Sequence, residues 1–210
     1  MPDTHDIKAV VFDLGNVLIN WAPEAFFDNQ IGAERRKAFF DAVPMHETNL
    51  NIDRGYPFRD TIADLAQAHP EWQTEIWMWH DNWLQMASPR ISHSERLLRA
   101  LKSKGIPVLS LTNFGVETFE IAKEEYEFLS LFDQSYVSGQ LKCIKPDAEI
   151  YAHLEAGSGF SGTELIFADD RTDNVKAAAQ RGWHTHLFTT PQGWADRLVS
   201  EQLLTEEEAQ

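Results

Sequence analysis

The sequence is short of three things: cysteine, long apolar runs and positive charge. Its single cysteine, Cys143, excludes an intramolecular disulfide and is typical of proteins from reducing compartments. No apolar run approaches the ~20 residues that a helix needs to span a bilayer. Lysine and arginine number 18 against 33 aspartate and glutamate residues, which gives a formal net charge of −15. This imbalance argues against nucleic acid and against anionic membranes as partners.

The remaining bulk features favour a cytoplasmic protein with one sizeable core. Residues 1–6 are polar and acidic and lack the pattern of a signal peptide. A chain of 210 residues is long enough for a core domain and a smaller inserted one. The expected partner is a small molecule, and the sequence leaves both a monomer and a homodimer open.

Strand and helix patterns alternate along most of the chain. Short apolar runs predict strands at 7–13, 106–111, 135–138, 165–168 and 184–188. Amphipathic stretches predict helices at 94–104, 116–132, 147–156, 172–181 and 192–204. Such alternation is typical of a parallel sheet with right-handed crossovers. The predicted fold class is α/β, with a Rossmann-like parallel sheet flanked by helices.

One segment interrupts this alternation. Between residues 21 and 88, apolar residues recur at helical spacing and no strand pattern is visible. We expect about four helices here, forming a helical cap domain inserted after the first strand. The Rossmann-like core then comprises residues 1–20 plus 89–210.

The first predicted strand ends in a carboxylate, Asp13, which precedes a tight turn at Gly15-Asn16. An acidic side chain at the mouth of a buried strand does not serve packing, whereas ligands bind at the carboxyl ends of strands in open α/β sheets. Other polar residues follow predicted strands in a similar way, namely Thr112, Asn113, Lys145, Asp169 and Asp170. We therefore expect these side chains to meet at one edge of the sheet.

These residue types favour phosphoryl-transfer chemistry. Asp13 and Asp170 with water make a fitting Mg²⁺ site, because Mg²⁺ takes few protein oxygens and keeps its waters. Lys145 supplies a fixed cation, and Thr112 and Asn113 supply a hydroxyl and an amide. A carboxylate can itself be the nucleophile and form an aspartyl-phosphate.

At this point the chain resembles the haloacid dehalogenase-like hydrolases over nearly its whole length. The matching motifs are FDLGNV (12–17), LTN (111–113), IKPD (144–147) and FADDRTDN (167–174). Each motif alone is weak, but the four in this order and spacing are highly specific. The Asp-Leu-Gly-Asn sequence is similar to that of a subgroup of the first cap class related to sugar-phosphate phosphatases.

The resemblance implies a role for each matching residue. Asp13 would be the nucleophile, Thr112 would hold a phosphoryl oxygen, and Lys145 would neutralise the nucleophile and the transferred group. The implied Mg²⁺ ligands are Asp13, Asp170 and the backbone carbonyl of Gly15. Asp169 and Asn174 would support these ligands from behind. The candidate substrate contacts are Asn16, Asn113, Trp21 and Asp53.

The sequence departs from the family pattern at one position. Related phosphatases carry a second aspartate two residues after the nucleophile, where this chain has Gly15. That acid protonates the leaving group and later activates water, and its loss usually removes on the order of 10²–10⁴ in rate. The inserted segment would have to supply a proton carrier, for which His46, Glu47 and Asp53 are the candidates.

The predicted function is a Mg²⁺-dependent phosphatase that hydrolyses a small phosphorylated metabolite, such as a sugar phosphate, through an aspartyl-phosphate on Asp13. Two alternatives stay open. A 2-haloacid dehalogenase would use Asp13 to displace halide without a metal, with Arg35, Arg36 or Arg54 binding the substrate carboxylate. A phospholigand-binding protein with weak catalysis would retain the site without fast turnover.

Overall fold

The computed structural model describes residues 7–210, so the polar N-terminus 1–6 lies outside the described residues. Five strands form one sheet in the order β3-β2-β1-β4-β5, and every pairing is parallel. The strands are β1 (Ala9–Phe12), β2 (Val108–Thr112), β3 (Gln134–Val137), β4 (Leu165–Asp169) and β5 (His184–Leu187). The central strand β1 is fully buried, which is why it reads as an uninterrupted apolar run. The predicted α/β fold class is confirmed.

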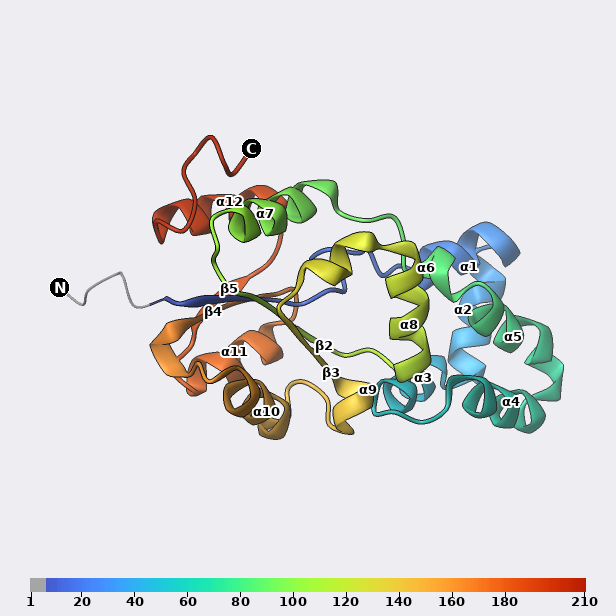
Figure 1. Cartoon of the computed structure of the whole chain (residues 1–210). Coiled ribbons are helices and arrows are strands. Elements are labelled where there is room, and N and C mark those ends of the chain that lie inside the picture. The colour runs from blue at the N-terminus through green and yellow to red at the C-terminus, as the bar shows by residue number, and fades with distance from the viewer. Residues whose placement is uncertain (1–6) are drawn as a thin grey trace.

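Helices cover both faces of the sheet (Figure 1). The covering helices are α7 (Ser92–Ser103) and α12 (Pro191–Ser200) on one face, and α10 (Ala148–Ser158) and α11 (Thr172–Gln180) on the other. Val10 and Phe12 belong to the core beneath α7 and α12. Ala9 and Val11 belong to the second core, beneath α10 and α11. Burial on both faces fixes the register of β1 and therefore the position of the residue that follows it.

The helix predicted over 116–132 is two helices. The first, α8 (Val116–Glu125), ends at Tyr126, and a short 3₁₀-helix, η2 (Glu127–Leu131), follows. Tyr126 has an extended backbone, and its hydroxyl donates a hydrogen bond of 2.7 Å to the carbonyl of Ala87. The apolar periodicity continues across the break because both pieces pack against the same core. Two other short helices are α9 (Ser138–Leu141) and η3 (Gly162–Glu164).

Between β1 and α7 the chain forms helices from Pro23 to Met86, more of them than the four or so expected. They are α1 (Pro23–Ile31), α2 (Ala33–Ala42), α3 (Met45–Asp53), α4 (Phe58–Ala68), η1 (Pro70–Trp72), α5 (Gln73–Asp81) and α6 (Trp83–Met86). Single residues separate some of them, such as Gly32 with its positive φ of 80° between α1 and α2. Breaks of one residue leave the apolar periodicity almost intact, so the sequence pattern predicts one helix where the structure has two. These helices lie beyond the carboxyl edge of the sheet (Figure 1).

None of the helices within residues 7–210 combines the length and the apolar character that crossing a membrane requires.

Candidate active site

The carboxyl ends of three neighbouring strands bring the polar motif residues together. Asp13 directly follows β1, Thr112 is the last residue of β2, and Asp169 is the last residue of β4. Asp170 comes next in the chain, and Lys145 lies in the loop before α10. Each side chain is thereby fixed by a buried strand or by a loop packed against one.

A cavity of about 410 Å³ lies between this sheet edge and the inserted helices. The residues selected from the sequence that line it are Asp13, Gly15, Asn16, Trp21, Asp53, Thr112, Asn113, Lys145, Asp170 and Asn174. Asp169 does not line the cavity because it is fully buried beneath it. The cavity also includes Ile19, Asn20, His46, Asn49, Leu50, Trp83, Ala87, Phe114 and Arg171. Asn49 and Leu50 lie one helical turn before Asp53, a spacing that could have revealed them.

Lys145 joins two carboxylates in a buried charge cluster. Its Nζ lies 2.8 Å from Oδ1 of Asp13 and 2.6 Å from Oδ2 of Asp169, and its side chain is 1% exposed. Burial alone would lower the pKa of Lys145, but Asp13 and Asp169 together outweigh burial and raise that pKa above 10.5. The lysine therefore stays charged and holds both carboxylates in place.

Of the two carboxylates paired with Lys145, Asp13 is the one that lines the cavity. Burial raises the pKa of its carboxyl from 3.8 to about 7, although Lys145 opposes this rise. The nearby charges of Asp169 and Asp170 add to the rise. Oδ1 of Asp13 also accepts a hydrogen bond of 2.7 Å from the backbone N–H of Leu14. Extra positive charge in the cavity would keep Asp13 ionised.

The donor set fits a magnesium ion. One oxygen each from Asp13, Asp169 and Asp170 can be chosen so that all three lie within 4.8 Å of one another. These carboxylates face a single ammonium group, because the guanidinium of Arg171 pairs with Asp173 instead. Hard oxygen ligands with an excess of negative charge are the surroundings that Mg²⁺ prefers.

Asn174 supports the cluster from α11. Its Nδ2 lies 3.0 Å from both carboxylate oxygens of Asp169. Its Oδ1 is buried and finds no hydrogen-bond partner among residues 7–210. Because a buried polar atom is normally paired, this oxygen is a further site for a water or ion in the cluster.

Asn16 and Asn113 are predicted to contact substrate, but their side-chain amides form hydrogen bonds within the protein. Asn113 accepts from the backbone N–H of Lys145 at 2.8 Å and donates to its carbonyl at 3.0 Å, so it clamps the loop that carries the lysine. Asn16 donates to Asp170 at 3.0 Å and accepts from the backbone N–H of Trp21 at 2.9 Å. Asn16 has a positive φ of 54°, a conformation that asparagine adopts more readily than most residues.

Aromatic side chains form part of the cavity wall. The ring centroids of Trp21 and Trp83 lie 5.9 Å apart, and those of Trp83 and Phe114 lie 5.6 Å apart. Leu50 also lines the cavity and is 40% exposed. A ligand bound here would have a charged group at the sheet edge and an apolar surface against the inserted helices.

Comparison with known proteins identifies the class of enzyme. Residues 7–182 match the sequence model of the haloacid dehalogenase-like hydrolases. The chain belongs to this family of hydrolases, as the four motifs indicated.

Two characterised relatives are phosphatases. The sesquiterpene phosphatase astK of Aspergillus oryzae is 30% identical over 83% of this chain and 86% of its own length. The D-ribitol-5-phosphate phosphatase of Bacteroides thetaiotaomicron is 24% identical over 92% of this chain and 97% of its own. Among solved structures, the magnesium complex of a haloacid dehalogenase family enzyme from Bacteroides thetaiotaomicron superposes with a TM-score of 0.71. That structure is 23% identical and aligns over 92% of this chain and 98% of its own.

Proposed function

We propose that this hydrolase is a Mg²⁺-dependent phosphomonoesterase that works through an aspartyl-phosphate on Asp13. The observation that carries the proposal is the buried Lys145, paired with both Asp13 and Asp169 beside a third carboxylate. A dehalogenase needs no metal, so this concentration of acidic oxygens would have no use in it. The phosphatase relatives point the same way.

Each polar residue of the cavity has its own role in the proposed phosphoryl transfer. An oxygen of Asp13 attacks phosphorus in line with the departing ester oxygen, and Lys145 neutralises the negative charge shared by the two groups. Thr112, which is buried at the end of β2, holds a phosphoryl oxygen in the attack geometry. Asp13, Asp170 and the carbonyl of Gly15 would hold Mg²⁺, which when bound offsets charge on the transferring phosphoryl group.

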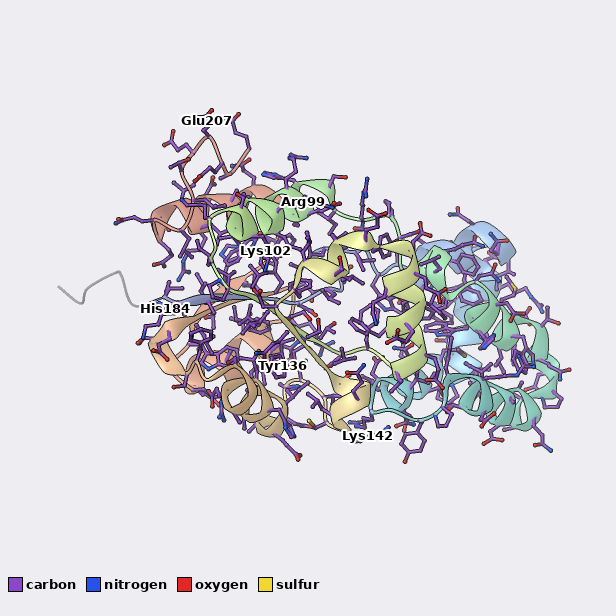
Figure 2. All side chains as sticks on the ribbon, in the orientation of Figure 1. Arg99, Lys102, Tyr136, Lys142, His184 and Glu207 are labelled. Carbon is purple, nitrogen blue, oxygen red and sulfur yellow. The ribbon has the colours of Figure 1, made fainter. Side chains whose placement is uncertain are left out.

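Residues 21–88 act in this proposal as a cap over a core formed by residues 1–20 plus 89–210. Ser138 Oγ donates a hydrogen bond of 2.6 Å to the carbonyl of Asp53. Lys142 Nζ donates one of 2.8 Å to the carbonyl of Gly55. Figure 2 labels Lys142 beside the end of α9, where the core meets the cap. A cap held in this way excludes bulk water during transfer.

The aromatic wall favours a substrate whose leaving group carries an apolar surface. Trp21, Trp83 and Phe114 offer flat apolar faces, and Leu50 leaves apolar surface free at the cavity wall. The relative that acts on a sesquiterpene substrate agrees with this reading, whereas the relative that acts on ribitol 5-phosphate represents the sugar-phosphate alternative. We propose the apolar alcohol over the sugar.

A substrate panel tests both parts of the proposal. Purified protein is incubated with alkyl, isoprenoid and polyol monophosphates, with Mg²⁺ or EDTA, and released phosphate is measured. We expect turnover only with Mg²⁺, higher kcat/KM for apolar substrates, and none for Asp13→Asn. Halide release from 2-haloacids in EDTA would establish the dehalogenase instead. Tight binding of phosphorylated ligands without phosphate release would establish the binding protein.

A further inference from the structure

We propose that Asp53, at the end of the inserted helix α3, is the acid–base residue that replaces the aspartate missing at Gly15. The inference rests on the proposed phosphatase function. Asp53 lines the same cavity as Asp13 and Gly15 and is 8% exposed. It therefore places a carboxyl group from an inserted helix in the cavity that holds the nucleophile.

The other candidates from the inserted segment are poorly placed. Glu47 is exposed and does not line the cavity. His46 lines it, but its side chain is 58% exposed and its Nε2 lies 3.3 Å from Oε1 of Glu24. Among the cavity-lining residues of the described chain, Asp53 is the carboxyl that takes no part in the cluster around Lys145.

Core and cap both fix the position of Asp53. Nδ2 of Asn49, one turn earlier on α3, donates a hydrogen bond of 3.0 Å to its Oδ2. The backbone N–H of Gly115, in the loop after β2, lies near enough to this carboxyl group to oppose part of the rise in its pKa. A Cβ at Gly115 would lie 2.7 Å from Cγ2 of Ile52, so only glycine permits this close approach. Ser138 holds the carbonyl of Asp53 itself.

These surroundings favour the protonated acid. Burial raises the pKa of Asp53 well above 3.8, and the hydrogen bond from Gly115 only partly offsets the rise. The negative charge of Asp13 raises it further. A general acid must carry a proton when substrate binds, and a buried carboxyl beside another carboxylate meets that requirement.

The two chemical steps then balance. As an oxygen of Asp13 bonds to phosphorus, the P–O bond to the leaving group breaks and the ester oxygen takes the proton of Asp53. In the second step Asp53, now a carboxylate, removes a proton from water while the water oxygen attacks phosphorus. The bond between Asp13 and phosphorus breaks, so inorganic phosphate is released, Asp13 is again a carboxylate and Asp53 again carries its proton.

Kinetics with two leaving groups test the role. The p-nitrophenolate ion leaves without a proton, whereas an alkoxide such as hexanolate does not. For Asp53→Asn we expect kcat/KM for hexyl phosphate to fall on the order of 10²-fold or more, with a fall of less than about tenfold for p-nitrophenyl phosphate. A burst of p-nitrophenolate should also appear, because breakdown of the aspartyl-phosphate loses its base. Glu47→Gln, on the same helix, is the control and should match the wild type.

A rescue variant separates chemistry from folding. A Cβ built at Gly15 meets no atom within 4 Å, so the backbone there has room for a side chain to begin. We expect Gly15→Asp combined with Asp53→Asn to regain at least tenfold on hexyl phosphate. Equal losses on both substrates, or no loss on either, would overturn the inference.

Two further controls keep the result decisive. If Asp53→Asn does not fold, the wild type alone decides: kcat/KM should vary little across leaving groups of rising pKa, and a steep fall would overturn the inference. Failure of the phosphatase proposal gives a different result from failure of the role of Asp53. The wild type would then release no more phosphate than Asp13→Asn, and both proposals would be wrong. If the wild type is active and Asp53→Asn is equally active, the inference about Asp53 is overturned and the phosphatase proposal stands.

Discussion

Replacing Lys145 by methionine should destabilise the protein far more than the loss of an ordinary lysine. The ammonium lies 2.8 Å from Asp13 and 2.6 Å from Asp169, and its side chain is 1% exposed. Lys145→Met keeps the length and the apolar stem but leaves two carboxylates buried without their partner. Breaking a buried ion pair in this way costs about 3–5 kcal/mol. For a chain of this size, that corresponds to a fall in Tm of about 6–20 °C.

Thermal unfolding in EDTA measures this loss. Lys123→Met is the matched control, because Lys123 forms an exposed pair with Glu120 and should cost less than about 1 kcal/mol. Adding Mg²⁺ should raise the Tm of Lys145→Met more than that of the wild type, since the variant cluster has one more unbalanced negative charge. If Lys145→Met melts within about 2 °C of Lys123→Met in EDTA, the buried charge cluster described here is wrong.

Three further substitutions probe the packing and the pocket. The Arg181 guanidinium holds the pKa of Glu155 below 4.5, so this pair should stabilise the fold above that pH and lose its effect as pH falls through the lowered pKa. In urea titrations Glu155→Gln should therefore cost about 1–2 kcal/mol at pH 7 and progressively less below pH 4.5. Leu50→Ala should raise KM for apolar phosphates about tenfold while leaving Tm nearly unchanged, because Leu50 is 40% exposed. Gly115→Ala should cost about 1–3 kcal/mol and lower kcat, since its Cβ would meet Ile52, whereas its φ of −65° suits alanine, so the contact and not backbone strain causes the loss.

Much of the site could be predicted because each of its charged residues is tied to a local pattern. A fully buried strand reads as an apolar run, so the polar residue at its end is conspicuous, as Asp13 is after β1 and Asp170 is just beyond β4. Parallel topology then brings those ends to one edge of the sheet. Fold class and family followed from the same patterns, and both are confirmed.

What the sequence could not provide depends on contacts between distant segments. The pattern at Asn113 suggests an amide aimed at substrate, but the structure uses both of its polar atoms on the backbone of Lys145. At the break at Tyr126, the tyrosine hydroxyl bonds to the distant Ala87, a contact that no local periodicity encodes. Asp53 could be chosen over Glu47 only once burial and the cavity were known.

Moving the acid from the core to the cap has a mechanistic consequence. An aspartate at position 15 would stand beside Asp13 whether or not the cap is seated, whereas Asp53 reaches the cavity only while α3 packs on Gly115 and Ser138. In such an enzyme, seating of the cap brings the proton donor and the residues that exclude water to the cavity at the same time. A substrate that does not pack against the aromatic residues would therefore bind without the proton donor in place. Variants that loosen this contact should therefore lose rate with alkyl phosphates before they lose it with p-nitrophenyl phosphate, the same selectivity expected for Asp53→Asn.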